Sequence, residues 1–577
     1  MNKLSDKTWF CLIAGLALLI RLLYLYTYYR SPYWAIMSLD PETHELLARR
    51  LAEGLGLGTR AYFRAPLYLY FLGSLSKLFG PGYLAPRLGQ ALLGSLSAGF
   101  TFLLARKLLS RAGAVAAGLL AALSWDLVYF DGELLLESLA TFFNLAGLLV
   151  LYRSEATQRR GLFLAGILFG LSAITRPNLL LVVAVILALL LLAKPRLESL
   201  PRAAALFAGI FLAVLPVTLR NAIVAHDLVL VASQGGINFY LGNHPEADGL
   251  TVAVPYPRRL IPREFQARYA SDPWFKEDVW LASVYGAEQA RGRPVKESEV
   301  SSYWFGESFR EMGPHPLRWL ALFLRKTYFL FHRTEVSNNR DLYYHRAQFP
   351  LLRALAVVNV AWLAPLALVG FGLALPEFRR FRWLLTFGAA YSLSVILFFV
   401  NSRFRAPLLP LAFIFAMLAV ERMAGWARSR AFPKLFGALA AGLILLGFCN
   451  APWLRWNDRP LRAAMHLDLG LAFARQAQYP EAEAEFREAL RIKDNIPEAH
   501  LSLGNVLALQ GREEQAIHEF IIALLEQPDY AEAHYNLGLT FQRLGRMEEA
   551  VRRFAEAHRL APSLYPAAPP KPELEGK

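Results

Sequence analysis

Apolar stretches of about 20 residues recur along the chain between residues 9 and 450, and this is the length that an α-helix needs to cross a bilayer. Of the 577 residues, 55% are hydrophobic, more than the usual share in a soluble protein. The pattern therefore predicts an all-α, polytopic membrane protein with about eleven transmembrane helices. The predicted spans are residues 9–29, 87–106, 112–130, 134–152, 161–175, 178–193, 203–221, 351–375, 383–400, 406–421 and 435–450.

Basic residues between the spans predict the orientation of the chain. The formal net charge is +15, but many Lys and Arg residues flank apolar segments, as the positive-inside rule expects, so the charge does not require nucleic acid. The basic flanks are Lys3 with Lys7, and clusters at 106–111, 153–160, 194–202, 379–382 and 422–434. If all are cytoplasmic, the long loops 30–86 and 221–350 lie outside, and the short apolar stretches 67–79 and 317–331 are interfacial helices.

A different pattern begins after residue 450. Gly470, Gly504 and Gly538 are spaced by 34 residues, and several Ala and Phe positions keep the same step. These positions are Ala482, Ala516 and Ala550; Phe486, Phe520 and Phe554; and Ala489, Ala523 and Ala557. The period is typical of tetratricopeptide repeats, whose concave surface binds a peptide or protein; a purely structural array is the alternative.

The domain prediction follows from these two patterns. Residues 1–450 form the membrane domain, and residues 451–577 form three repeats with a Pro-rich tail. Because three repeats are the minimum for stability, we expect the array to lean on the membrane domain or on a second copy. Loop 221–350 is expected to form an extracytoplasmic cap over the active site, since its Trp and Tyr content argues against the alternative, a loosely ordered connector.

The loop that follows the first span, residues 38–66, is rich in ionisable groups. Asp40 opens a predicted helix in it and is our candidate for a catalytic base at the membrane surface. The alternative is a helix N-cap, because Asp followed by Pro is a common helix start. For His44 we favour contact with substrate over metal ligation with Glu42 or Asp40, because no second His lies at ligand spacing.

Acids and arginines mark the other predicted outer turns. Glu133 and Glu137 are four residues apart, so they share one helical face at a span end, where ionisable groups are costly and often functional. The alternative is a pair of acids that simply reach water at the membrane surface. Asp131, one step further into the turn, is predicted to be plain surface.

Five arginines lie near span ends on the same predicted face: Arg64, Arg87, Arg176, Arg403 and Arg405. A guanidinium fork suits bidentate binding of phosphate. Anchoring at the interface by snorkelling is the alternative, but the positive-inside rule predicts few Arg residues here, which favours an anionic partner.

The motifs stand in a fixed order: Asp40, Arg64-Ala65-Pro66-Leu67, Phe79-Gly80, Arg87, Glu137, Thr175-Arg176-Pro177, and Arg403-Phe404-Arg405-Ala406-Pro407. In this order they resemble the GT-C superfamily, in the branch of the protein O-mannosyltransferases and the lipid A aminoarabinose transferase. The resemblance implies an inverting glycosyltransferase that moves a sugar from a polyprenyl-phosphate donor to an acceptor hydroxyl outside the cytoplasm. It implies Asp40 as the general base and Glu137 as a supporting acid. The residues implied for the lipid phosphate are Arg64, Arg176, Arg403 and Arg405, and Glu133 and His44 complete our candidate substrate contacts.

A body of this kind followed by tetratricopeptide repeats also resembles the transmembrane O-mannosyltransferases of animals that carry such repeats, which implies a protein acceptor. A bacterial relative fits equally well, so we expect an integral protein of a bacterial plasma membrane, with the active site and the repeats outside. The expected partners are a polyprenyl-phosphate sugar, membrane lipid, and a peptide or protein on the repeats, with no nucleic acid. The two cysteines predict no zinc site or disulfide framework; no cofactor is predicted, and dependence on a divalent metal stays open.

Two other functions remain as alternatives. A transporter or flippase of a lipid-linked sugar would use the same cations without chemistry, and it predicts more charges within the spans than the sequence shows. A non-catalytic scaffold of an envelope glycan assembly complex would depend on the repeats and not on Asp40.

Overall fold

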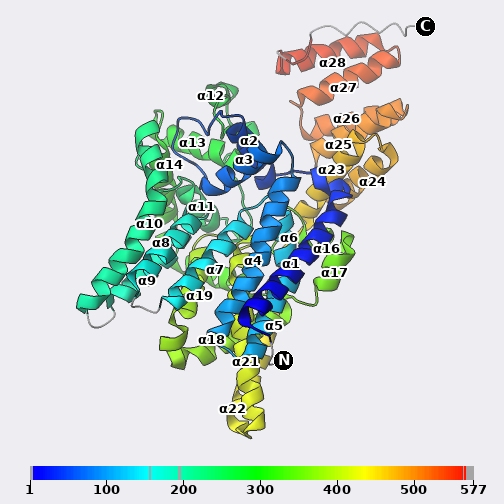
Figure 1. Ribbon diagram of the computed structural model, residues 1–577. Helices are drawn as coiled ribbons and strands as arrows, with labels where there is room; N and C mark the ends of the chain where they lie inside the picture. Colours follow the sequence, from blue (N-terminus) through cyan, green and yellow to red (C-terminus); the bar gives the residue numbers. More distant parts are fainter. Residues whose placement is uncertain (1–3, 155–157, 193–195, 563, 567–577) are drawn as a thin grey trace. The chain divides into compact units, whose positions relative to one another are not determined.

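The computed structural model describes residues 4–154, 158–192, 196–562 and 564–566. Within these ranges the chain forms α-helices and short 3-10 helices and no strand, which confirms the all-α fold class (Figure 1). Lys3, Lys194 and most of the predicted Pro-rich tail lie outside the described residues. The chain divides into two compact units: Met1–Tyr26, Leu39–Asn338 and Arg346–Arg455 form the first, and Thr27–Ser38, Asn339–His345 and Trp456–Lys577 form the second.

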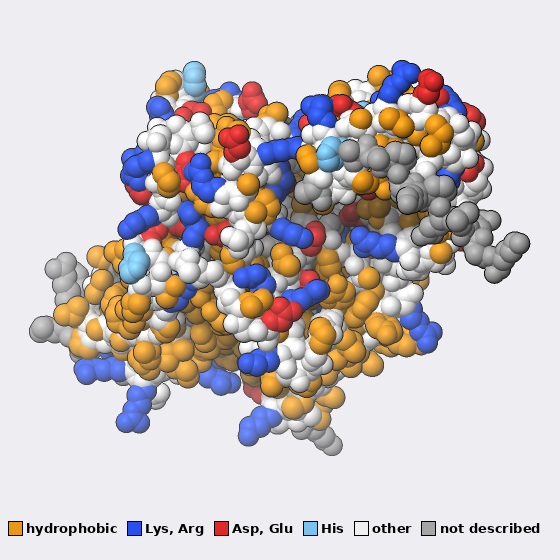
Figure 2. All heavy atoms as spheres, turned by 90° about the horizontal axis from the view of Figure 1, so that it is seen from above, with side chains coloured by type: hydrophobic (Ala, Val, Ile, Leu, Met, Phe, Trp, Pro, Cys, Tyr) orange, Lys and Arg blue, Asp and Glu red, His pale blue; other side chains and the backbone are white. Residues whose placement is uncertain are grey.

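In the part of the chain that the structure describes, six stretches are helical, long and apolar enough to cross a membrane, which supports an integral membrane protein. They contain α1 (Asp6–Tyr29), α4 (Leu84–Arg106), α10 (Arg196–Val224), α17 to α19 (Pro350–Leu355, Val360–Ala374, Phe378–Ile396), α21 (Leu409–Arg428) and α22 (Phe432–Asn450). Figure 2 shows broad fields of exposed hydrophobic side chains with Lys and Arg projecting at their edges.

The predicted count of eleven spans is not confirmed. A seventh span would be the pair α5 (Arg111–Leu123) and α6 (Trp125–Gly132), which is bent by 45°. The other predicted spans of this region are shorter helices: α7 (Glu137–Arg153), α8 (Arg159–Ala173) and α9 (Leu179–Leu192) have 17, 15 and 14 residues. Hydropathy alone does not separate such short buried helices from spans.

The prediction that Asp131 is plain surface is wrong. Asp131 lies in α6 and is only 4% exposed. Its carboxylate accepts a hydrogen bond from Arg21 Nε in the middle of α1, at 2.6 Å, and another from Ser138. Gly94 in α4 makes room for it, because a Cβ at that position would meet the Asp131 carboxylate. The segment around Asp131, predicted to be an outer turn, therefore lies inside the helix bundle, where a carboxylate needs a partner.

Two amphipathic helices follow α1 in the first unit. α2 (Asp40–Ala52) and α3 (Leu67–Phe79) occupy the predicted loop helix and the predicted interfacial stretch, and they pack against each other. Leu78 and Phe79 remain exposed at the end of α3, as expected where a helix lies on a membrane. The other predicted interfacial stretch forms α15 (Pro316–Phe331), which is not among the six candidate spans.

Residues 221–350 form several helices and share a buried core with residues 47–69 of the first loop, so the alternative of a loosely ordered connector is wrong; we call this segment the cap. Its helices include α11 (Gly235–Asn243), α12 (Arg263–Tyr269), α13 (Asp278–Arg291), α14 (Glu297–Met312) and α16 (Leu342–Gln348), the last shared between the two units. The buried indoles of Trp274, Trp280 and Trp304 are the largest side chains of the cap core.

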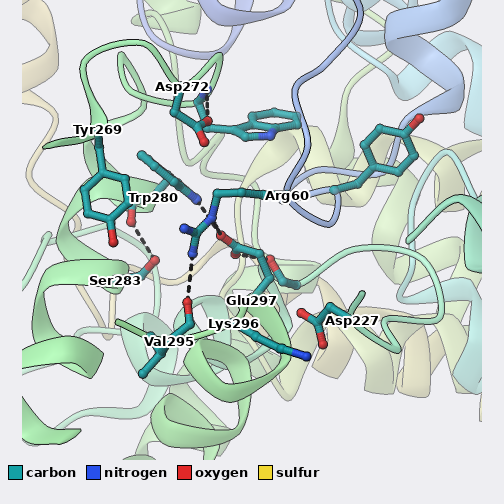
Figure 3. Close-up of polar contacts among 12 residues, drawn as sticks. Arg60, Asp227, Tyr269, Asp272, Trp280, Ser283, Val295, Lys296 and Glu297 are labelled. Carbon is teal, nitrogen blue, oxygen red and sulfur yellow. Dashed lines mark hydrogen bonds and ion pairs between the residues drawn. The ribbon is translucent and has the colours of Figure 1, made fainter. Parts of the chain in front are cut away.

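A partly buried ion pair ties the cap to the first loop (Figure 3). Arg60, between α2 and α3, donates from Nε to Glu297 at 2.8 Å and from a second nitrogen to the Val295 carbonyl at 3.0 Å. Glu297 also accepts hydrogen bonds from the Trp280 indole and from Ser233. The loop that carries Asp40 is thus fixed to the cap a few residues before Arg64.

The second unit contains three helix pairs. They are α23 (Arg459–Arg475) with α24 (Tyr479–Ile492), α25 (Pro497–Leu509) with α26 (Glu513–Glu526), and α27 (Ala531–Arg543) with α28 (Met547–Leu560). The sequence period has a direct structural cause, since a Cβ on Gly504 would lie 2.5 Å from the ring of Phe520. The equivalent glycines Gly470 and Gly538 meet Phe486 and Phe554 in the same way.

Two short segments from the membrane half of the sequence belong to this second unit. Asp341 is fully buried and accepts a hydrogen bond from Arg462 of α23 at 2.9 Å. Tyr344 lies against the ring of His466, with centroids 4.7 Å apart. The repeat array therefore packs on residues outside itself, as a minimal array requires.

Candidate active site

Asp40 is the first residue of α2, and its carboxylate lies between two guanidinium groups. Arg64 donates to it at 2.6 Å and Arg403 donates to its other oxygen. Among the described residues, no hydrogen bond joins this carboxylate to a backbone N–H of α2, so the alternative of a simple helix cap does not describe it. Leu39 precedes it with φ of 58°, a backbone conformation that is unfavourable for leucine and is found at constrained sites.

The two arginines extend the contact into a row of alternating charges. On one side Arg64 also binds Glu277, at 2.7 Å. On the other side Arg403 binds Glu137 at 2.5 Å, and Glu137 accepts a second hydrogen bond from Arg176 at 2.7 Å. We call these six residues, Glu277, Arg64, Asp40, Arg403, Glu137 and Arg176, the charge network.

The elements that carry the network come from most of the membrane half of the sequence. Glu137 begins α7, and Arg176 follows α8 directly. Arg403 lies on the short helix α20 (Ser402–Arg405), whose first turn is capped by the Asn401 side chain. Five of the six network residues were predicted from the sequence as site residues, and the fold brings them together.

Arg405 is predicted for the same role as Arg403 but lies apart from the network. Residues two apart on a helix face different directions, so Arg405 binds Glu335 and the His332 carbonyl instead. It lines a cavity of about 180 Å³ between α15, α18, α19 and α21. Among the described residues of that lining, Arg405 carries the one charge and most of the others are aliphatic or aromatic.

The electrostatics of the network favour an ionised Asp40. Burial opposes the charge, but the guanidinium groups of Arg64 and Arg403 outweigh it and hold the pKa of Asp40 well below its usual range. For Glu277 burial outweighs its contact with Arg64, so the pKa of this carboxyl is raised. Arg64 thus binds two carboxyls whose pKa values are shifted in opposite directions, lowered for Asp40 and raised for Glu277.

His44 and Glu133 lie outside the network. His44 is buried one turn after Asp40 and donates from Nδ1 to the Leu134 carbonyl at 2.9 Å. Burial, followed by the positive charge of Arg64, lowers the pKa of His44 to about 3, so it is neutral at pH 7. Glu133 is 1% exposed, and its backbone carbonyl accepts a hydrogen bond from Gln90. His44 thus joins α2 to the turn before Glu137, and Glu133 joins the same turn to α4.

Sequence reasoning missed Glu277, which lies in the cap with no motif around it. The available signal was an acid within an aromatic segment, Trp274 to Trp280, of a loop expected to cover the site. No group of three or more His, Cys, Asp or Glu side chains is placed to hold a metal ion in the part of the chain that the structure describes.

Comparisons with known proteins match two separate parts of the chain. Residues 63–221 match the family described as dolichyl-phosphate-mannose-protein mannosyltransferase. Four overlapping segments, 454–500, 467–521, 504–545 and 531–564, match tetratricopeptide repeat families. No curated protein matches the chain.

Several solved structures resemble it at low identity. The apo oligosaccharyltransferase of Archaeoglobus fulgidus is 14% identical, with a TM-score of 0.44 over 84% of this chain and 58% of that one. The same archaeal enzyme, in complex with an inhibitory peptide and a dolichol-phosphate, is 16% identical with a TM-score of 0.42, over 84% and 58%. YrrB, described as a tetratricopeptide repeat protein with an unusual peptide-binding site, is 16% identical with a TM-score of 0.18, over 33% of this chain and 84% of that one. The chain thus spans less than two thirds of the archaeal enzyme.

The family match supports a glycosyltransferase that takes its sugar from a lipid-linked donor. The repeats support binding of a peptide or protein. The chain therefore joins a segment that matches the dolichyl-phosphate-mannose-protein mannosyltransferase family, residues 63–221, to C-terminal tetratricopeptide repeats.

Proposed function

We propose that the chain is an inverting glycosyltransferase that moves a sugar from a polyprenyl-phosphate donor to an acceptor hydroxyl at the extracytoplasmic face of the membrane. The observation that carries the proposal is the position of Arg403, which binds Asp40 and Glu137 at once. A cation that can bind phosphate therefore lies directly beside the candidate base. Transfer from a lipid phosphate needs both groups within reach of one sugar carbon.

The donor lipid is proposed to occupy the apolar cavity that Arg405 lines. A polyprenyl chain needs an apolar path, and its phosphate needs a cation at the end of that path. Arg405 supplies a charge at the cavity, and Arg403 lies two residues before it on the same short helix. The phosphate would thus lie between the cavity and the charge network.

Binding of the phosphate would change the partners of Asp40. As long as Arg403 and Arg64 bind it, Asp40 is strongly acidic and a weak base. A donor phosphate that draws Arg403 away removes one of these two charges, and the pKa of Asp40 rises towards a value suited to a base.

In the transfer step, Asp40 takes the proton of the acceptor hydroxyl. The acceptor oxygen attacks the anomeric carbon from the face opposite the phosphate, and the carbon–oxygen bond to the phosphate breaks with its electron pair leaving on the phosphate. Arg403 and Arg176 stabilise the charge that grows on this leaving group. Glu137 holds these two arginines in place. The repeats would present a protein that carries the acceptor hydroxyl.

The test is release of free polyprenyl phosphate from a panel of labelled polyprenyl-phosphate sugars by the purified full chain. Asp40→Asn should abolish release without weakening donor binding. Glu42→Gln is the matched control, because Glu42 is an exposed acid in the same helical turn. If Asp40→Asn turns a donor over as fast as the wild type, the base lies elsewhere. If the wild type binds donors and releases nothing, a transporter or scaffold explains the site better.

A further inference from the structure

A hollow with basic walls lies where α1 begins and where α4 and α7 end. Its volume of about 580 Å³ is in the range of sites that hold small molecules. Four cations from these three helices line it, namely Lys7, Arg106, Lys107 and Arg153. The apolar lining residues are Phe10, Cys11 and Leu103. We call this site the basic hollow.

The basic hollow carries an excess of positive charge. Asp6 is the one acid among the described residues that line it, and four cations face this single carboxylate. Asp6 is 3.4 Å from Arg106 and 3.5 Å from Arg111, and its side chain is 42% exposed, so these pairs are weak. In the part of the chain that the structure describes, no ion pair engages Lys7, Lys107 or Arg153.

The hollow is remote from the charge network. Glu137 begins α7 and Arg153 ends it, and 17 helical residues at a rise of 1.5 Å separate the two by about 24 Å. That distance is close to the thickness of a bilayer's hydrocarbon core, about 30 Å. Because the hollow also lies at the ends of α1 and α4, two of the candidate spans, we expect it at the opposite membrane surface, where phospholipid headgroups lie, with apolar residues beside its cations.

We propose that the basic hollow binds the phosphate of an anionic phospholipid headgroup. Basic pockets between membrane helices have the chemistry for this, since the cations meet the phosphate while the apolar wall meets the start of the acyl chains. If these basic residues served only to orient the chain in the membrane, they would be spread around the helix ends. Here cations of three helices converge on one cavity with a single acid. The proposal is independent of the reaction at Asp40.

The test compares two double variants of the full chain for retention of phosphatidylglycerol in native mass spectrometry. Lys107→Gln with Arg153→Gln should weaken retention roughly 30-fold, because each cation at a membrane surface is worth about a factor of five. Arg428→Gln with Arg430→Gln, exposed residues at the end of α21 that do not line the hollow, should leave it unchanged. Equal losses in both double variants would mean general surface charge and would overturn the proposal.

A native thiol gives an independent readout. Both cysteines are free, and Cys11 is exposed and lines the hollow while Cys449 is buried. Phosphatidylglycerol in nanodiscs should slow alkylation of Cys11 relative to phosphatidylcholine, and the hollow variant should lose this protection. If inorganic phosphate in detergent protects Cys11 as well as phosphatidylglycerol does, the site takes a free anion and the lipid source is wrong. No protection by either would also overturn the proposal.

Discussion

Asp40 and Glu137 each bind two arginines, yet their removal should affect stability differently. Without the Asp40 carboxylate, Arg64 retains Glu277 and Arg403 retains Glu137. Without the Glu137 carboxylate, Arg403 retains Asp40, but Arg176 loses its carboxylate in the network. Arg176 is only 7% exposed, so its charge would be left buried.

The magnitudes follow from this count of partners. Breaking a buried pair so that one charge is stranded costs about 3–5 kcal/mol. Losing a hydrogen bond to a charged group, with both arginines still paired, costs about 1.5–3 kcal/mol. We therefore expect Glu137→Gln to be less stable than Asp40→Asn by about 2 kcal/mol. Adding Arg176→Gln to Glu137→Gln should recover most of that difference, because it removes the stranded charge.

The assay is thermal unfolding of the purified full chain in one detergent at neutral pH, since 1 kcal/mol moves the Tm of a medium-sized domain by roughly 2–4 °C. The expected order of Tm is wild type, then Asp40→Asn, then Glu137→Gln, with the double variant above Glu137→Gln. The reasoning fails if Asp40→Asn is as unstable as Glu137→Gln. It fails equally if Arg176→Gln lowers the Tm of Glu137→Gln further.

Three more predictions concern other parts of the molecule. Burial lowers the pKa of His44 to about 3, so between about pH 6.5 and pH 3 the unfolded chain binds a proton that the folded chain does not. The free energy of unfolding should therefore fall as pH drops through this range, by up to about 1.4 kcal/mol per pH unit. In thermal unfolding, His44→Gln should reduce this dependence on pH, and an unchanged dependence would contradict the assignment. Gly504→Ala places a Cβ 2.5 Å from the Phe520 ring and should destabilise the repeats by about 1–3 kcal/mol, seen as faster proteolysis after residue 455, whereas equal rates would show that the ring can move. Removing the charge of Glu277 leaves Asp40 more acidic and therefore a weaker base, so Glu277→Gln should lower kcat with little change in donor affinity. A raised KM at constant kcat would instead assign Glu277 to donor binding.

Helical periodicity and repeat spacing were enough to predict the fold class. The glycine that recurs every 34 residues is required because the phenylalanine ring of the paired helix packs directly against it. The spacing seen in the sequence is therefore a direct consequence of this contact. The apolar stretch 67–79, which we predicted to be an interfacial helix, forms a helix with these limits. The span count was harder, because α7, α8 and α9 are as apolar as spans but shorter.

The sequence was enough to predict most residues of the candidate site, but not how these residues pair with one another. Acids and arginines on the predicted outer face pointed to Asp40, Glu137 and Arg403, but nothing in the sequence says which arginine binds which acid. Glu277 pairs with a residue 213 positions away, and no local pattern encodes such a contact. Asp131 was misjudged for a similar reason, since its burial depends on Arg21 in another helix.

The charge network also bears on how the protein is made. Its members appear in the chain in the order Asp40, Arg64, Glu137, Arg176, Glu277 and Arg403, so the last one is synthesised after more than two thirds of the sequence. Until α20 is in place, Asp40 and Glu137 share no common partner. An N-terminal fragment that ends before α20 would therefore lack both the complete charge network and the part of the apolar cavity that Arg405 and α21 line, and the network would be completed late in membrane insertion.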